Sequence, residues 1–149
     1  MDLTQAARDT LMPLGYEVLE VSVGPHGRSR RVLVRIDRLD EQVVAVEDVR
    51  HASEAFGLEL DRLDPFEGAY QLEVESPGAQ RPLFTARHFE RFHDLLVKLR
   101  VGGSQLSGRV RAVEGDVVVF ETATGEPPRR LRVDEIERAH LAEWPESPR

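Results

Sequence analysis

Apolar residues recur at helical spacing at the start of the chain. Four of them are separated by four, four and three positions, namely Leu3, Ala7, Leu11 and Leu14. This spacing predicts an amphipathic helix with Thr4 as an early cap and Gly15 at its end. Two alternating stretches follow, YEVLEVSV at 16–23 and RRVLVRID at 30–37, and the segment GPHGRS separates them. Their period of two predicts a β-hairpin with a loop of about six residues.

A second helical pattern begins near Val46 and has an apolar face that runs to Phe56. Two acidic residues in its first turn suit the positive end of the helix dipole. The polar segment 57–65 predicts an exit from this helix, and 69–75 predicts a third strand. The first 75 residues therefore predict an α/β domain with the order helix, strand, strand, helix, strand.

The pattern changes after residue 83. Thr85 is a suitable cap for a short helix that runs to His93. Five short strand-like segments follow, at 95–101, 105–113, 116–123, 129–133 and 137–142. Several short strands joined by tight turns predict a small β-barrel of the SH3-like or Sm-like kind.

The segment ESPGAQRPL, residues 75–83, connects the two patterns. Pro77 fixes its own φ and Gly78 tolerates a positive φ, so the pair suits the centre of a type II turn. Pro82 favours an extended conformation for Arg81. We therefore predict an α+β protein with three parts: an N-terminal α/β domain at 1–83, a C-terminal SH3-like barrel at 84–142 and a flexible tail at 143–149.

The acidic charge lies in the first half of the chain. The formal net charge is −7: residues 1–75 carry eight arginines and 16 acidic residues, whereas residues 76–149 carry 12 basic and 11 acidic residues. This division suits an acidic surface for a basic protein and local arginines for RNA, although a net charge of this size also serves solubility alone. The chain has no cysteine, no apolar stretch of about 20 residues and no signal-peptide pattern, so we expect a cytoplasmic protein without membrane contact.

The sequence contains no motif that is typical of catalysis. It has no P-loop, no GxGxxG and no GxSxG pattern. His88 and His93 are five positions apart, which places them on different faces of a helix and not in a zinc-binding arrangement. We therefore predict no enzyme activity, no metal, no cofactor and no small-molecule substrate.

Arginine clusters are the remaining candidates for recognition. Arg28, Arg30 and Arg31 lie in the predicted hairpin, with Arg35 on the following strand. A second set lies on the predicted barrel, namely Arg109, Arg111, Arg129, Arg130 and Arg132. Arginine suits contacts with phosphate or with an acidic partner. The same residues are equally expected as solvated side chains on half-exposed strands.

The segment YQLEVESPGAQRPL, with HFERF after it, resembles the signature of the ribosome maturation factor RimP family. Similar runs lie on both sides, in LGYEVLEV, VRID, VEDVRHAS and GLELDRLDPF. The resemblance implies a cytoplasmic, non-enzymatic assembly factor with an α/β domain and an SH3-like barrel. It also implies a partner, the immature small (30S) ribosomal subunit, including ribosomal RNA and small-subunit ribosomal protein twelve.

The resemblance also identifies six motif residues at the connection, namely Glu73, Ser76, Pro77, Gly78, Arg81 and Pro82. It implies that they fix the angle between the domains and present Arg81. A purely structural role is the alternative, above all for Pro77 and Gly78. An Sm-like protein that binds free RNA through its barrel is the alternative function.

Overall fold

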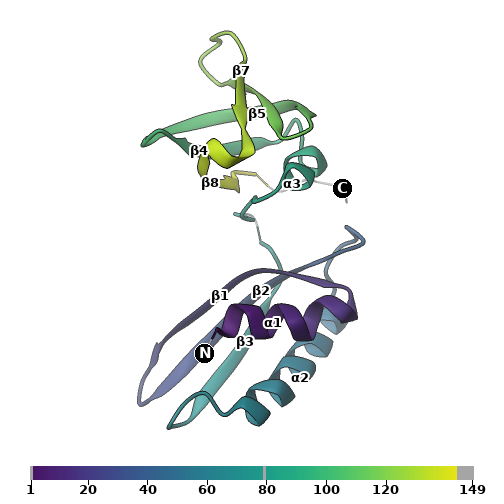
Figure 1. Ribbon diagram of the computed structural model, residues 1–149, viewed down its shortest axis with the longest axis vertical. Coiled ribbons are helices and arrows are strands. Elements are labelled where there is room, and N and C mark those ends of the chain that lie inside the picture. Colours follow the sequence, from purple (N-terminus) through teal and green to yellow (C-terminus); the bar gives the residue numbers. More distant parts are fainter. Residues whose placement is uncertain (1, 79, 144–149) are drawn as a thin grey trace. The chain divides into compact units, whose positions relative to one another are not determined.

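The computed structural model describes residues 2–78 and 80–143, and within these residues it contains two β-sheets and three α-helices (Figure 1). The chain forms two compact units, Met1–Pro77 and Gly78–Arg149. This architecture confirms the predicted α+β class. The described helices are all too short or too polar to cross a membrane. Residues 144–149 of the predicted tail at 143–149 lie outside the described residues.

The first unit is a three-stranded sheet with two helices on one face (Figure 1). Its elements are α1 (Leu3–Leu11), the 3₁₀ turn η1 (Met12–Leu14), β1 (Tyr16–His26), β2 (Ser29–Arg38), α2 (Val46–Leu63) and β3 (Tyr70–Glu75). The sheet order is β1-β2-β3, with β1 antiparallel and β3 parallel to β2. Helix α2 is therefore the crossover between two parallel strands. The core between helices and sheet contains Ala7, Leu11, Tyr16, Val18, Val32, Val34, Ile36, Ala52, Phe56 and Leu60.

Two local predictions for α1 and the hairpin were wrong. The side chain that caps α1 belongs to Asp2 and not to Thr4, because Asp2 Oδ1 accepts a hydrogen bond from the Gln5 backbone N–H (3.1 Å). The hairpin loop is also shorter than predicted, since strand pairing continues to His26 and Ser29. Pro25 is tolerated in this ladder because β1 is an edge strand. On the free side of an edge strand a residue without a backbone N–H costs no hydrogen bond between strands.

Helix α2 continues through Gly57 to Leu63, although the sequence predicted an exit at that glycine. Leu60 explains the difference, because it extends the buried stripe of Ala52 and Phe56 by another turn. The helix ends at Asp64, which adopts a left-handed conformation (φ 47°). Burial of Leu60 thus outweighs the weak helix propensity of Gly57.

Replacing Gly57 with alanine is expected to stabilise the first unit by about 0.5–1 kcal/mol, because glycine is a poor residue inside a helix. The new Cβ would lie 3.9 Å from Leu72 Cδ2, an ordinary van der Waals contact. Urea unfolding followed by circular dichroism measures the change. A lower free energy of unfolding for Gly57→Ala would show that the contact with Leu72 does not tolerate the methyl group.

Asp48 organises the start of α2, which lacks a capping side chain at Ala45. Its Oδ2 accepts hydrogen bonds from the Ala45 backbone N–H (2.7 Å) and from Arg38 Nη1 (3.4 Å). Its Oδ1 accepts from the Tyr16 hydroxyl (3.1 Å), and the same hydroxyl lies 3.1 Å from His51 Nδ1. The bond from Ala45, followed by those from Tyr16 and Arg38, holds the pKa of Asp48 below its ordinary value of 3.8.

The stabilising effect of Asp48 is expected to depend on pH. Because the pKa of Asp48 is lowered by folding, its charge stabilises the folded state above the unfolded pKa, and this contribution is lost as pH falls below about 4. Asp48→Asn should therefore cost about 1 kcal/mol at neutral pH and progressively less in acid. Urea unfolding of both proteins at several pH values measures the difference. A constant difference would contradict a role for the charge.

The second unit contains a five-stranded sheet with the order β7-β6-β5-β4-β8 and one short α-helix among its described residues. Its elements are α3 (Ala86–Arg91), β4 (Leu96–Val101), β5 (Ser104–Glu114), β6 (Val117–Thr122), β7 (Arg129–Arg132), the 3₁₀ turn η2 (Val133–Glu135) and β8 (Ile136–Leu141). All five predicted strands are present. Within the described residues no ladder joins β7 to β8, so the sheet is not closed and the predicted SH3-like barrel is not shown.

The core of this unit lies between α3 and the sheet. It contains Leu83, Phe89, Phe92, Leu95, Val97, Leu99, Val110, Val118, Phe120, Leu131, Ala139 and Leu141. The predicted cap of α3 is confirmed, because Thr85 Oγ1 accepts from the His88 backbone N–H (3.2 Å). His88 completes this cap, since its Nδ1 accepts from the backbone N–H groups of Phe84 (2.9 Å) and Thr85 (3.3 Å). His88 thus plays the part that a glutamate plays in a capping box.

Residues 81–83 form an additional short edge beside β8. The Leu141 N–H donates to the Arg81 carbonyl (2.9 Å), and the Leu83 N–H donates to the Ala139 carbonyl (3.0 Å). Pro82 pairs with His140 between these two bonds. The segment that the sequence assigned to the N-terminal domain therefore pairs with a strand of the second unit, which begins at Gly78.

Candidate nucleic-acid interface

The first four motif residues end β3 and form the connection to the second unit. Glu73 is half-exposed and pairs with Arg31 across the sheet (Oε2–Nη2 2.9 Å). Ser76 is exposed and Pro77 is buried. Gly78 has a φ of 74°, the positive value that the second central position of a type II turn requires. None of these side chains forms a pocket on its own, so the local geometry favours a structural role.

Arg81 is fully buried, which differs from the expectation that the connection presents it. Its guanidinium lies over the ring of Phe92, at 5.1 Å from the ring centroid. Its Nη1 donates to the Pro82 carbonyl (2.8 Å). A buried cation needs such partners to offset its loss of hydration. Arg81 therefore stabilises the second unit from within and is not a contact residue on its surface.

The hairpin arginines lie beside a shallow pocket of about 520 Å³ in the first unit. It is lined by the hairpin turn and by the loop between α2 and β3, including Arg28 and Arg30. The Arg30 guanidinium lies 5.8 Å from the centroid of Phe66, and Arg28 is exposed. Arg31 and Arg35 instead form ion pairs with acidic residues on β1 and β3. The structure thus separates the four arginines into two exposed and two paired residues.

Most of the predicted arginines in the second unit already have acidic partners. Arg109 pairs with Glu143 (2.8 Å) and Arg111 with Asp94 (2.9 Å). Two further pairs are Arg130 with Glu114 (2.7 Å) and Arg132 with Asp134 (3.2 Å). The hydrogen bonds that Arg111 donates to Asp94 and then to Glu121 raise the pKa of Arg111. Within the described residues only Arg129 of this set has no carboxylate within 4.0 Å.

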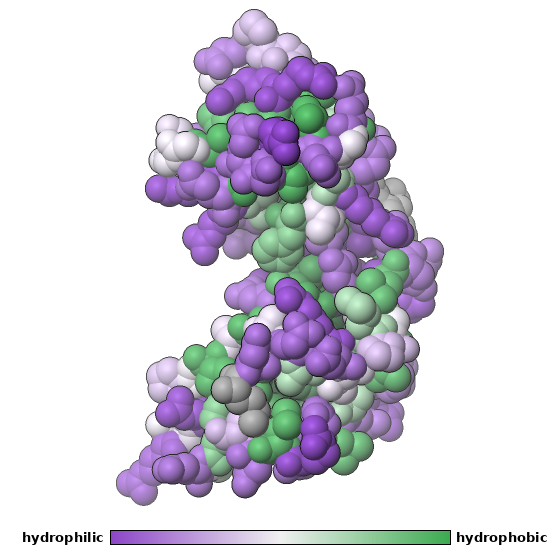
Figure 2. Space-filling view, viewed as in Figure 1, coloured by the Kyte–Doolittle hydropathy of each residue, from purple (hydrophilic) through white to green (hydrophobic). Residues whose placement is uncertain are grey.

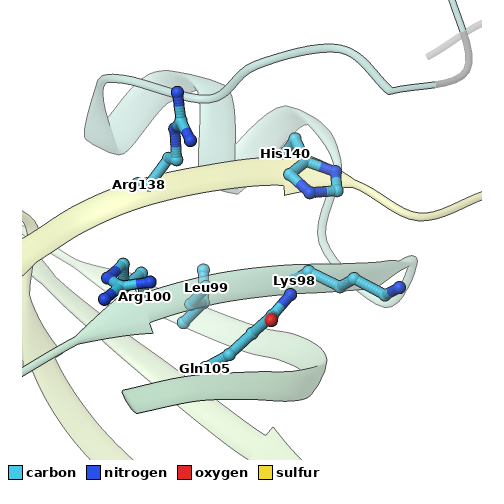
Figure 3. Close-up of a pocket in the computed structure, with 6 residues that line it drawn as sticks. All are labelled: Lys98, Leu99, Arg100, Gln105, Arg138 and His140. Carbon is cyan, nitrogen blue, oxygen red and sulfur yellow. The ribbon is translucent and has the colours of Figure 1, made fainter. Parts of the chain in front are cut away.

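The structure brings together a basic cluster that the sequence analysis missed. Lys98 and Arg100 project from the outer face of β4, and their cross-strand partners on β8 are His140 and Arg138. With Gln105 and Leu99 they line a groove of about 220 Å³, shown in Figure 3. The alternation in LVKLRV predicts that Lys98 and Arg100 share a face. The pairing of β4 with β8 joins residues about 40 positions apart and has no local signal.

Figure 2 shows hydrophilic residues over much of the visible face of each unit, with hydrophobic residues between them. In residues 2–78 and 80–143 no group of three or more His, Cys, Asp or Glu side chains is arranged to hold a metal ion. Exposed cations, beside the acidic residues of the first unit, are therefore the candidate contact groups of the described surface.

The comparison with known families agrees with the motif at the connection. Residues 6–80 match the family model described as the RimP N-terminal domain. The match covers α1 from residue 6 onward, both strands of the hairpin, α2, β3 and the first part of the connection, which is just over half of the chain. The chain therefore belongs to the RimP family, a family of ribosome maturation factors.

Proposed function

We propose that this protein binds the immature small (30S) ribosomal subunit and promotes its maturation by binding alone. Its partners are ribosomal RNA and small-subunit ribosomal protein twelve, and its place of action is the cytoplasm. Binding favours one arrangement of RNA and protein through differential affinity, so no covalent step is needed. Membership of a ribosome maturation family is the observation that carries this proposal.

The division of charge between the two units supports two different partners. The first unit contains eight arginines and 16 acidic residues, whereas the second has a formal charge of +1. An acidic unit suits a basic ribosomal protein, and exposed cations suit the RNA backbone. In this proposal Arg28, Arg30 and Arg129 are the exposed contact residues of the predicted clusters. The paired arginines, such as Arg111 and Arg130, reach RNA only if they exchange their acidic partners.

We also propose that the second sheet forms an SH3-like barrel that is open between β7 and β8. Its five short strands and tight turns support this view. The motif residues then have structural roles: Glu73 pairs within the first sheet, Ser76, Pro77 and Gly78 lead the chain out of β3 with a positive φ at Gly78, and Arg81 and Pro82 pair with β8.

Sedimentation with ribosomal subunits tests the proposed function. The full chain is incubated with immature and with mature small subunits, and the protein recovered with each is measured. We expect recovery with the immature subunits and little with the mature ones. Equal recovery with both, or none with either, would contradict the proposal. Tight binding of free RNA without recovery on immature subunits would instead favour the alternative, an Sm-like RNA-binding protein.

A further inference from the structure

We propose that the groove over β4, β5 and β8 binds the phosphate backbone of RNA. The inference deepens the proposed function and rests on it, because it assigns the RNA contact to a specific surface of the second unit. The groove is lined by Lys98, Leu99, Arg100, Gln105, Arg138 and His140 (Figure 3). Three of these side chains are cations, and none is acidic.

Cross-strand pairing of basic side chains is the first argument. Arg100 lies directly opposite Arg138, and Lys98 lies directly opposite His140. Like charges at opposed positions destabilise a sheet, whereas opposite charges stabilise it. The two pairs are about 7 Å apart along the strands. The Arg100–Arg138 pair therefore opposes two like charges, which folding alone does not favour and which an anion bound between the strands would stabilise.

The pairing of other arginines on the same sheet is the second argument. Arg109, Arg111, Arg130 and Arg132 each have a carboxylate partner at 2.7–3.3 Å. Within the described residues Lys98 and Arg138 have no carboxylate within 4.0 Å, and only Arg100 is paired, with Glu137 (3.4 Å). Glu137 also accepts from the Gly103 backbone N–H (3.0 Å), so its charge is shared with a second partner. The groove thus keeps an excess of positive charge.

The composition of the groove indicates which part of RNA it contacts. Lys98, Arg100 and Arg138 offer only hydrogen-bond donors, and the Gln105 amide offers two more. No Phe, Tyr or Trp is among the described residues that line it, so the large aromatic platforms of single-strand binders are missing from this lining. Phosphate oxygens are acceptors and carry charge, so they fit this donor set. We therefore expect contacts that position the RNA backbone and do not read its sequence.

A paired comparison of double variants tests the groove. The test variant is Lys98→Gln with Arg138→Gln in the full chain, and the control is Arg130→Gln with Arg132→Gln on β7. Both remove two positive charges from the same sheet, but only the first removes them from the groove. Binding to a short single-stranded RNA of mixed sequence is measured by fluorescence anisotropy at several salt concentrations. Circular dichroism melting confirms that each variant remains folded.

We expect the groove variant to bind the RNA roughly tenfold more weakly at low salt. The slope of log K against log salt should become shallower by about 1.4, because two phosphate contacts are lost. The β7 control should keep the wild-type slope. Equal weakening of both variants would show a general charge effect and overturn the proposal, as would an unchanged slope for the groove variant. A loss of binding to polyglutamate with unchanged RNA binding would assign the groove to an acidic protein and would also overturn it.

The two proposals fail in different ways. If the wild-type chain and the groove variant are recovered equally well with immature subunits, the assignment of RNA binding to the groove is wrong. The proposed function then still stands. If the wild-type chain is not recovered with immature subunits, the proposed function fails whatever the RNA titration gives. Reduced recovery of the groove variant, with normal recovery of the β7 control, supports both.

Discussion

Replacing Gly108 with alanine is expected to destabilise the second unit by about 3 kcal/mol or more, because β5 and β6 must move apart. A Cβ at this position would lie 2.1 Å from the Glu121 carbonyl oxygen and 2.9 Å from Thr122 Cα, both of them backbone atoms of β6. Backbone atoms within a central ladder cannot turn away as a flexible side chain can. Thermal unfolding followed by circular dichroism measures the loss.

Gly24→Ala provides a matched control for this effect. Gly24 is also a strand glycine, but a Cβ there meets nothing within 4 Å and its φ is not positive. The free energy of unfolding should therefore change by no more than about 0.5 kcal/mol. Hydrogen exchange should assign the effect of Gly108→Ala to the second sheet and leave the first sheet protected. Similar melting curves for the two variants would contradict the close approach at Gly108.

Much of the secondary structure could be predicted because it depends on local patterns. The alternation of apolar and polar residues gave all five strands of the second sheet, and the helical stripe at Leu3, Ala7 and Leu11 gave α1. Predictions failed where a local signal and the tertiary structure disagree. Gly57 resembles a helix end, but burial of Leu60 extends α2 past it.

The candidate site was less predictable because it depends on which strands become neighbours. The arginines at 109–111 and 129–132 are clustered in the sequence and were therefore candidate contact residues. In the structure, acidic residues pair with most of these arginines. The β4–β8 groove has the opposite character, since single cations from distant segments meet there. Residue spacing along a strand indicates a shared face, but it does not indicate the partner strand.

Two motif residues at the connection lie next to the strand that carries part of the groove. The segment that resembles the family signature includes Arg81 and Pro82, which lie beyond the matched residues 6–80, and the structure places both beside β8. Strand β8 carries Arg138 and His140, so it lies between the motif on one side and the groove residues of β4 on the other. Arg81 and Pro82 therefore hold β8 from the side opposite the groove residues of β4. This arrangement gives the signature a physical role in the second unit.

Replacing Arg81 with alanine is expected to destabilise the second unit by about 3 kcal/mol, because a large buried side chain is removed and a cavity remains. The contact with Phe92 and the hydrogen bond to the Pro82 carbonyl are lost as well. Urea unfolding measures the change. Hydrogen exchange of the Leu141 amide, which donates to the Arg81 carbonyl, should also become faster.

Arg91→Ala separates burial from the contact between a cation and an aromatic ring. The Arg91 guanidinium lies 4.6 Å from the centroid of Phe92, closer than that of Arg81, but Arg91 is only partly buried. If the ring contact alone mattered, the two variants would lose similar stability, about 0.5–1 kcal/mol each. Because Arg81 is fully buried, we expect Arg81→Ala to cost several times more than Arg91→Ala. Equal losses would show that Arg81 contributes no more than a surface arginine, and the motif would then need another explanation.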